Sequence, residues 1–347
     1  MVKALTYNDG IAAVYGGAIL GGGGGGLLEE GLKLVKEIFA AGEPQLVDIT
    51  ELDHKDLVAC VAMVGAPSAA DQYISNEQLC WSYQSMNTYM DQRLKGIITN
   101  ENGAITTING WLQSVLVNVP VVDAPCNGRA HPTGIMGSLN LHEQQHYQSL
   151  QFYAGGKDHL AVQGFVEGDL QNTAKTVRHA SILAGGLVAV TRNPITIDYL
   201  RQHGAPNAIT MAIELGYSFL NGRTFEERLS NVVQQLNGVH IVSGEVTNYS
   251  LTKDNGFDIG KLAVGDYELT FWNEYMTLTK DGQLQSKFPD LMMTFDIDNM
   301  LPVPSASVKE GMHVAVIHVD QRYLTLSSTM QNQALLREID TVIAKIL

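Results

Sequence analysis

The sequence predicts an α/β protein whose first half forms a mainly parallel sheet and whose second half is rich in β-strands. Helical and strand-like patterns alternate through about residue 125, which is typical of βαβ units. From Gly238 onwards, short apolar segments are separated by turn residues. A chain of 347 residues is long enough for about two domains, and we expect them to be residues 1–170 and 171–347.

In the first half, the expected helices and strands follow one another in turn. Apolar residues at helical spacing over 11–19 predict a first helix, capped by Asn8 and Asp9. By the same criteria we expect helices over 27–41, 76–94 and 108–117, and strands over 45–49, 57–64 and 96–99. The apolar run 115–122 predicts a strand that ends at Asp123.

After about residue 125 the regular alternation ends, and from Gly238 the pattern becomes mainly extended. We first expect strand-like segments over 135–141 and 149–153 and helices over 173–182, 207–220 and 223–236. Strands are then expected over 239–249, 259–264, 267–272, 276–279, 291–296 and 313–319. Residues 330–347 predict a closing helix.

The composition argues against several classes of partner and cofactor. The formal net charge is −14 and no run of Lys or Arg occurs, so we expect no nucleic-acid partner. No apolar run approaches the roughly 20 residues that span a bilayer, so we expect no membrane partner. Cys60, Cys80 and Cys126 form no C-x-x-C pair, and the chain starts without a signal peptide, so we expect free thiols and a cytoplasmic protein.

The loop after the expected strand 115–122 carries the densest set of reactive side chains. It contains an acid, a thiol, an amide, a guanidinium and an imidazole, namely Asp123, Cys126, Asn127, Arg129 and His131. Ligands of open α/β sheets bind at the carboxyl ends of strands. We expect Cys126 to be exposed there, with its pKa lowered by Arg129 and His131, and to act as a nucleophile. The alternatives are a buried apolar Cys126 and an Asp123 that caps a turn instead of orienting His131 or Arg129.

Six consecutive glycines, residues 21–26, precede the expected helix 27–41. Leu27-Leu28 follows them where a Walker loop needs Gly-Lys-Ser/Thr, and a helix precedes them where a dinucleotide fingerprint needs a strand. Glycines before a helix can still donate N–H groups to an anion or a carbonyl. We therefore expect either a substrate-facing role for Gly23, Gly24 and Gly25 or tight packing of this loop against a neighbouring backbone.

Residues 142–146 match the H-E-x-x-H pattern of zinc hydrolases. The motif lies between strand-like segments, whereas zinc binding by this pattern requires a helix. We therefore expect no cofactor, with zinc held by His131, His142 or His146 as the alternative. Solvated turn histidines are the default interpretation of His142 and His146.

Polar residues also occur where apolar ones are expected. Glu101 and Asn102 lie in the polar loop 100–104, and Asn273 and Glu274 interrupt an apolar strand. A charge on such a strand is costly without a partner or a ligand. We expect one cleft to be lined by the glycine run, the 123–131 loop and Asn273-Glu274, with loop residue Asn102 contributing to ligand binding.

Five segments in this order resemble the S-methyl-thiohydantoin desulfurase family across residues 8–325. They are Leu20–Gly26, Met63–Pro67, Val121–Asp123 together with Gly128–Ala130, Asn273–Glu274 and Pro289–Leu291. The resemblance implies a Rossmann-like N-terminal domain and a C-terminal swivelling β/β/α-type domain. It also implies hydrolysis at C2 of a hydantoin-like five-membered ring.

The chain departs from many members of that family in the loop after Asp123. Pro125 stands where they have a second acid, and His131-Pro132-Thr133 stands where they have Phe-Pro-Glu. The departures suggest a thiol-based variant, in which Cys126 attacks C2 and methanethiol leaves, His131 moves protons, and Asp123 or Arg129 orients His131 or stabilises charge. We expect a homo-oligomer. A metal-dependent hydantoinase-like amidohydrolase and a non-catalytic partner subunit of a hydantoinase or oxoprolinase are the alternatives.

Overall fold

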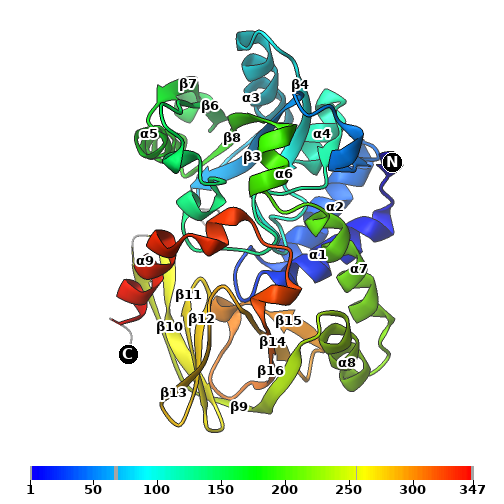
Figure 1. The fold of residues 1–347 in the computed structure, drawn as a ribbon, viewed down its shortest axis with the longest axis vertical. Coiled ribbons are helices and arrows are strands. Elements are labelled where there is room, and N and C mark those ends of the chain that lie inside the picture. Colours follow the sequence, from blue (N-terminus) through cyan, green and yellow to red (C-terminus); the bar gives the residue numbers. More distant parts are fainter. Residues whose placement is uncertain (1, 66–68, 255, 345–347) are drawn as a thin grey trace.

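A computed structural model describes residues 2–65, 69–254 and 256–344 of the chain. The fold consists of two eight-stranded sheets with helices α1 (Tyr7–Leu20) and α7 (Ala208–Asn221) between them (Figure 1). Residues 66 and 67 of the Met63–Pro67 segment and the last three residues of the expected closing helix lie outside the described part.

The first sheet has the strand order β1-β2-β5-β4-β3-β8-β6-β7. Its strands are β1 (Val2–Ala4), β2 (Gln45–Val47), β3 (Leu57–Gly65), β4 (Leu94–Thr99), β5 (Val121–Val122), β6 (Ser149–Gly155), β7 (Val162–Gly168) and β8 (Leu187–Thr196). Only β2, β5, β4 and β3 are mutually parallel, and all other pairs are antiparallel. The expectation of a mainly parallel sheet therefore holds for this four-stranded core, while the whole sheet is mixed.

The helices α2 (Leu28–Ala41), α3 (Asn76–Tyr89) and α4 (Trp111–Val117) confirm the alternation predicted to about residue 125. The helix α5 (Leu170–Leu183) covers the expected helix 173–182, whereas α6 (Ile197–His203) was not expected. The helix α1 is capped by Thr6, two residues before the expected cap Asn8, through a capping box with Asp9. No helix in the described part of the chain is long and apolar enough to cross a bilayer.

Two strand predictions in the first half are wrong. The run 115–122 is helical as far as Val117, because the helix ends only at Asn118 in the left-handed conformation, and β5 is confined to its last two residues. Residues 135–141 contribute to two short 3₁₀ helices, and positive φ angles at Leu139 and Asn140 interrupt any extended path.

The second sheet is antiparallel throughout, with the order β13-β12-β11-β10-β9-β16-β14-β15. Its strands are β9 (Val239–Asp254), β10 (Phe257–Val264), β11 (Tyr267–Trp272), β12 (Glu274–Lys280), β13 (Gln283–Lys287), β14 (Leu291–Asp296), β15 (Leu301–Val303) and β16 (His313–Val319). The helices α8 (Phe225–Gln235) and α9 (Gln333–Ile343) complete this half. The prediction of a β-rich second half is confirmed.

The domain boundary expected at residue 170 does not follow the sheets. Strand β8, which lies beyond that residue, pairs with β3 on one side and β6 on the other, so it is central to the first sheet. The chain leaves the first sheet after α6 and reaches the second through α7. The sequence pattern had not revealed β8, so the sequence analysis assigned no strand of the first sheet to residues beyond 170.

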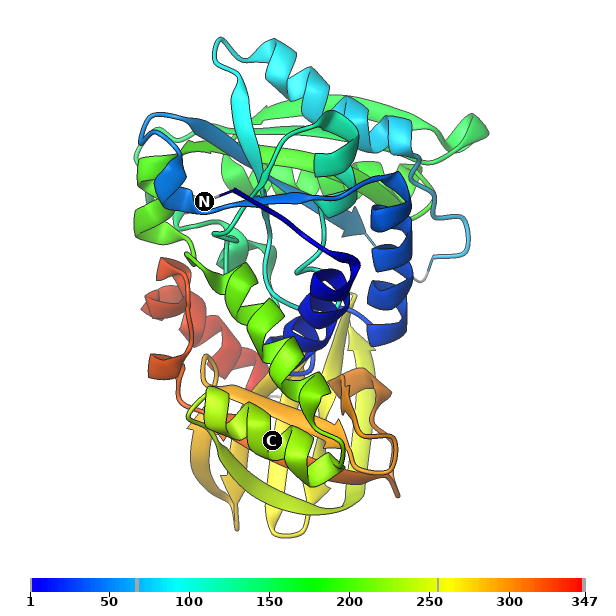
Figure 2. The ribbon, with the colours of Figure 1, turned by 90° about the vertical axis from the view of Figure 1, so that its right-hand side faces the viewer.

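Helices α1 and α7 cross at backbone contact and connect the two halves, as Figure 2 shows. A Cβ atom on Gly16 would lie 1.8 Å from the carbonyl oxygen of Ala212, and one on Gly216 would lie 1.8 Å from that of Ala12. One apolar cluster contains α1 and α7 residues together with β14 and β16 residues, including Leu20, Leu215, Met293 and Ile317. The halves therefore share a core.

We expect Gly216→Ala to lower the free energy of unfolding by about 2 kcal/mol, because the added methyl group forces the two helices apart. Gly134→Ala is the matched control, since no atom lies within 4 Å of the position of its Cβ. Chemical denaturation of both variants measures the difference. Equal stability of Gly216→Ala and wild type would contradict the close contact.

Candidate active site

Three segments of the first half converge on one strand of the second. Glu101 follows β4, and Arg129 and His131 follow β5, so both segments leave the carboxyl ends of parallel strands. The glycine run follows α1, and Glu274 begins β12. These residues form the candidate active site.

The glycine run is wedged between the two halves. A Cβ on Gly24 would lie 1.9 Å from Oε1 of Glu274, so no side chain fits there. The carbonyl of Gly22 accepts a hydrogen bond from the N–H of Tyr275 (2.8 Å), and that of Gly25 accepts one from Ile105 (2.9 Å). The N–H of Gly25, which is partly exposed, finds no acceptor in the chain as described. The loop packs tightly and also keeps a free donor at the site.

His131 and Glu101 form a buried pair. The Nε2 atom of His131 lies 3.0 Å from Oε2 of Glu101, and the His131 side chain is 2% exposed. The Nδ1 atom lies 3.0 Å from the carbonyl oxygen of Thr133. Burial and the charge of Glu274 hold the pKa of Glu101 well above its usual range, and burial lowers the pKa of His131 to about 3.

The hydrogen bonds of this pair determine where its proton lies. A carbonyl only accepts, so Nδ1 of His131 carries a proton and donates it to Thr133. Since neutral imidazole has one N–H, Nε2 is then an acceptor. The raised pKa of Glu101 and the lowered pKa of His131 leave both side chains uncharged at neutral pH. Nε2 of His131 lies 3.0 Å from Oε2 of Glu101 but is buried without a hydrogen-bond partner, so this nitrogen is free to accept a proton from a ligand or from the carboxyl.

Glu274 and Arg129 form the second part of the site. Both side chains are buried, Glu274 at 2% and Arg129 at 0% exposed. Burial raises the pKa of Glu274 to about 8 against the opposing charge of Arg129, and burial lowers the pKa of Arg129 to about 10. The carboxyl of Glu274 is thus poised to change its charge near neutral pH, while Arg129 keeps its charge.

The second sheet holds Arg129 through one of its two terminal nitrogens. Nη1 donates to the carbonyl oxygens of Pro289 (2.8 Å) and Asp290 (2.6 Å), and the guanidinium carbon lies 4.6 Å from the centre of the Phe288 ring. The Nε and Nη2 atoms are buried without a hydrogen-bond partner, and so is Oε2 of Glu274. Buried polar atoms are normally satisfied, so this cluster has capacity for a polar ligand or water.

The structure contradicts the premises of the nucleophile prediction for Cys126. The side chain is 1% exposed and belongs to an apolar cluster that includes Cys60 and Ile98. A hydrogen bond with Cys60, together with burial, holds the pKa of Cys126 well above its usual range. The basic side chains of the loop do not activate the thiol, because the chain turns Cys126 towards the core and Arg129 towards the second sheet.

Asp123 does not orient His131 or Arg129. Its Oδ1 accepts hydrogen bonds from the N–H groups of Ile209 (2.9 Å) and Thr210 (3.2 Å), and Oδ2 accepts one from the Thr210 hydroxyl. The carboxylate thus satisfies the first N–H groups of α7. Asp123 therefore has a capping role, which the sequence analysis gave as the alternative, and it caps the start of α7.

The three predicted amide side chains make structural hydrogen bonds. Asn102 donates to the carbonyls of Gly128 (3.3 Å) and Ala208 (2.7 Å). The side-chain Oδ1 of Asn127 accepts a hydrogen bond from the N–H of Ser327 (3.3 Å), and Oδ1 of Asn273 accepts one from the N–H of Asp258 (2.9 Å). Asn102 and Asn127 link the segments around the site by hydrogen bonds, and Asn273 stabilises the turn that precedes Glu274.

The H-E-x-x-H segment is not an α-helix. His142 lies in a 3₁₀ turn, and His146 has a left-handed φ of 65°. The side chain of His142 contacts the hydroxyl of Ser138 (3.1 Å), whereas His131 contacts Glu101. No group of three or more His, Cys, Asp or Glu side chains in the described ranges is placed to hold a metal ion. The α-helix that zinc binding by the H-E-x-x-H motif requires is therefore missing at residues 142–146.

Two residues at the site were missed or undervalued by the sequence analysis. Glu101 follows β4 as directly as Asp123 follows β5, so the same strand-end argument could have found it. Arg192 donates to Oδ1 of Asn100 (2.8 Å), and its charge opposes the rise in the pKa of Glu101. It lies on β8, which the sequence pattern did not reveal.

We expect Cys126→Ser to retain turnover within about twofold, because the thiol is a core group. The buried hydroxyl should cost about 1–2 kcal/mol of unfolding free energy. Parallel assays of activity and denaturation test this. Loss of activity in a folded, stable Cys126→Ser protein would restore the covalent mechanism.

We expect the purified protein to contain zinc well below one ion per chain, and its activity to survive a chelator. Metal analysis by mass spectrometry before and after dialysis measures this. Stoichiometric zinc that is lost with activity in His142→Ala or His146→Ala would establish the metal site instead.

Comparisons with known proteins agree with this architecture. Residues 11–161 match the family profile described as "S-Me-THD-like, N-terminal domain", and residues 168–327 match "S-Me-THD-like, C-terminal domain". No curated protein sequence matches the chain significantly. The crystal structure of a protein from Chromobacterium violaceum is similar in fold, with a TM-score of 0.76 at 17% identity, covering 99% of this chain and 97% of that one.

The two profiles are consecutive and together span nearly the whole chain. The site residues Glu101, Arg129 and His131 lie in the first matched region, and Glu274 lies in the second. The chain belongs to the S-Me-THD-like family, of which S-methyl-thiohydantoin desulfurase is the namesake.

Proposed function

We propose that this protein is a hydrolase that acts at C2 of a hydantoin-like ring, with an S-methyl-thiohydantoin as the substrate. Water adds to C2, the C2–S bond breaks, and methanethiol leaves with one proton of the water. The other proton ends on the ring nitrogen, so that the products are methanethiol and the hydantoin. The observation that carries this proposal is the convergence of the Glu101–His131 pair, Glu274 and Arg129 on buried polar atoms without partners.

Glu274 is the proposed general base for the attacking water. A base works best when its pKa lies near the working pH, and burial raises the pKa of Glu274 to about 8. Its Oε2 has no hydrogen-bond partner and is available to accept a proton from water. Arg129 keeps the ionised form accessible in a buried environment.

The Glu101–His131 pair is the proposed acid. The carboxyl of Glu101 holds the proton and lies 3.0 Å from the unpartnered Nε2 of His131. The side-chain amide of Asn100 and the backbone N–H of His131 both donate to Oε2 of Glu101 (3.4 and 3.3 Å). These donors stabilise the carboxylate that remains after the proton has moved to the departing sulfur. The proton that Glu274 has taken from water then returns to the Glu101–His131 pair.

Arg129 and Gly25 are the proposed groups that hold the ring. Attack at C2 moves negative charge onto the ring nitrogen and the conjugated carbonyl. Fixed donors in a water-poor site stabilise such charge strongly. The unpartnered Nε and Nη2 of Arg129 and the free N–H of Gly25 are donors of this kind.

Incubating the purified chain with an S-methyl-thiohydantoin tests the proposal. Methanethiol is measured with a thiol-reactive dye and the hydantoin by chromatography. Turnover by the chain alone would exclude a purely non-catalytic subunit, and turnover that survives a chelator would exclude a metal-dependent amidohydrolase. Methanethiol release that does not exceed the protein-free rate would overturn the proposal.

We expect Glu274→Gln to lower turnover by about 10²- to 10³-fold, because the amide cannot accept the proton. In the wild type, the base is active only when ionised, so turnover should rise with pH to about 8 and then level off. Glu268→Gln is the control, since Glu268 pairs with Lys261 (3.2 Å) on the surface of the second sheet. A flat pH profile, or equal turnover in both variants, would contradict the role of Glu274.

A further inference from the structure

The catalytic cluster is closed in this structure. Arg129, Glu274 and His131 are at most 6% exposed, so a ring-sized ligand cannot reach them unless part of the protein moves. The described chain offers two movements, a rotation of one half against the other or the displacement of a surface element. The packing distinguishes between them.

Rotation of the halves would break well-packed structure. The cluster containing Leu20, Leu215 and Ile317 is continuous across both halves, and α1 and α7 touch at their backbones near Gly16 and Gly216. Separating these surfaces exposes many buried side chains, each costing about 1.5–3 kcal/mol. Lifting α9 alone exposes three buried side chains of that helix, Leu335, Ile339 and Ile343, so it costs less than separating the halves.

The segment 328–343, here called the C-terminal strap, crosses from the first half to the second. Its beginning is firmly attached to the first half. The Thr329 hydroxyl donates to the carbonyl of Met136 (2.6 Å), and the Asn332 amide donates to Glu143 (2.7 Å) and Asn140 (3.1 Å). The strap follows directly after the family-matched residues.

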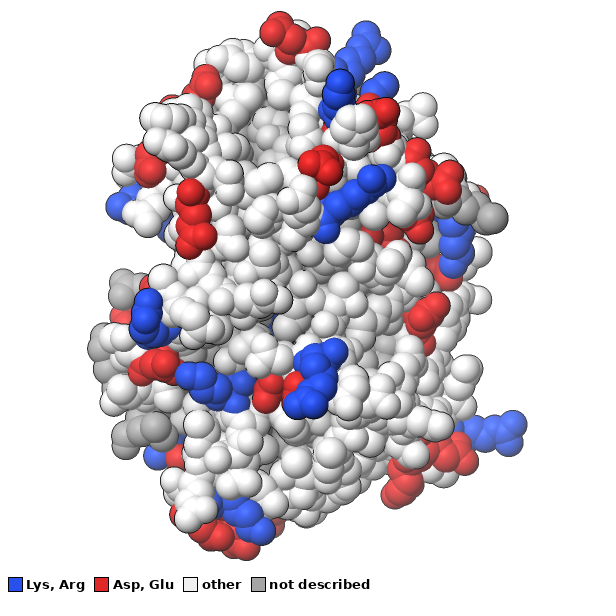
Figure 3. All heavy atoms as spheres, viewed as in Figure 1, with Lys and Arg blue, Asp and Glu red and all other residues white. Residues whose placement is uncertain are grey.

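The other end of the strap, α9, packs on the second sheet through the buried side chains Leu335, Ile339 and Ile343. Within the described residues, the polar contact between α9 and that sheet is the ion pair of Lys287 with Asp340 (2.9 Å), whose side chains are 45% and 55% exposed. Such exposed pairs contribute about 1 kcal/mol or less. Figure 3 shows basic and acidic side chains alternating on this face near the level of α9.

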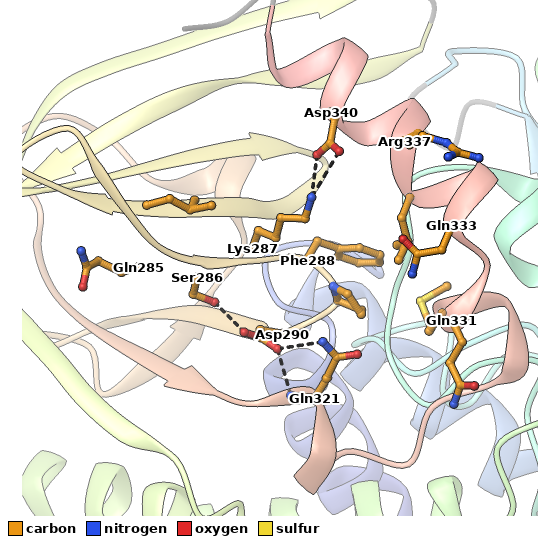
Figure 4. A pocket seen from close by; sticks show the side chains of 14 residues that line it. Gln285, Ser286, Lys287, Phe288, Asp290, Gln321, Gln331, Gln333, Arg337 and Asp340 are labelled. Carbon is orange, nitrogen blue, oxygen red and sulfur yellow. Dashed lines mark hydrogen bonds and ion pairs between the residues drawn. The ribbon is translucent and has the colours of Figure 1, made fainter.

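A cavity of about 520 Å³ lies between α9 and the segment that anchors Arg129. Its lining includes Lys287, Phe288 and Asp290 from the second sheet and Gln333 and Arg337 from the strap. Figure 4 shows Lys287 directed at Asp340 and Phe288 lying between that segment and the strap. The interface between α9 and the sheet is thus incompletely filled.

Residues 288–290 line the cavity and also contact the guanidinium of Arg129. Phe288 lines the cavity, and its ring also lies 4.6 Å from the guanidinium carbon. Phe288 packs in one apolar cluster with Trp272 and with Leu335 and Ile339 of α9. The helix α9 therefore contacts the same Phe288 ring that contacts Arg129.

We propose that the C-terminal strap is the movable cover of the active site. Its end α9 lifts from β11, β12 and β13 while its beginning stays on the first half, and the cavity then becomes the route to Arg129. On closing, α9 presses Phe288 against the guanidinium. That the substrate enters by this route rests on the proposed function, whereas the movement of α9 does not.

Two crosslinks at opposite ends of the strap test this in the full chain, in a Cys80→Ser background. Lys287→Cys with Asp340→Cys, joined by a short bismaleimide, ties α9 to the second sheet. Glu143→Cys with Asn332→Cys, joined by the same reagent, ties the stationary end to the first half. Hydrogen–deuterium exchange of residues 333–343 reports opening without any substrate.

We expect the Lys287–Asp340 crosslink to slow exchange in α9 and to lower turnover of the S-methyl-thiohydantoin, each by about tenfold or more. The Glu143–Asn332 crosslink should change both by less than about twofold. Equal effects of the two crosslinks, or exchange of α9 only upon global unfolding, would overturn the proposal. Slowed exchange without turnover in any sample would refute the proposed function and leave the cover intact.

Discussion

The buried charge of Arg129 is the constraint on which the arrangement of the two halves depends. A fully buried guanidinium is costly unless hydrogen bonds and an opposite charge compensate it. The compensation comes mainly from the second half, through the carbonyls of Pro289 and Asp290, the ring of Phe288 and the charge of Glu274. Asp290 is itself fixed by His318 (3.2 Å) and Ser286 (3.0 Å). A single side chain of the first half thereby sets the register between the two sheets.

The same burial determines the chemistry. The charge of Glu274 disfavours ionisation of Glu101, and a different guanidinium acts on each carboxyl, Arg192 on Glu101 and Arg129 on Glu274. Glu101 keeps its proton, whereas Glu274 remains near the point of ionisation. Environments that push two titratable groups apart in this way separate an acid from a base.

The sequence predicted much of the architecture because periodicity reports on local burial. The helix over 223–236 and the strands around Phe271 and Met293 have strong patterns and were found correctly. Strand β8 was missed although its first five residues are buried, since Arg192, Asn193 and Pro194 interrupt its apolar run. Tertiary pairing with β3 and β6 stabilises that strand, and no local pattern reports such pairing.

The site was predicted in outline for a similar reason. Arg129 and His131 were identified from their loop after a strand, the glycine run from its place before a helix, and Glu274 because a charge on an apolar strand needs a partner. The direction in which a loop side chain points depends on the surrounding fold, so Cys126 was assigned to the cleft although it faces Cys60 in the core. The undervalued acid, Glu101, had an equally good strand-end position but no unusual neighbours in the sequence.

The movement proposed for the strap and the proton chemistry are physically linked. Burial is the largest cause of the raised pKa of both Glu101 and Glu274. Water that reaches the cluster when α9 lifts would weaken this effect and bring the pKa of Glu274 down, towards the ordinary range of a carboxyl group. Closing the strap at neutral pH would then favour proton uptake at Glu274 while Phe288 returns to Arg129. Access for the ligand and adjustment of the base are therefore two consequences of one conformational step.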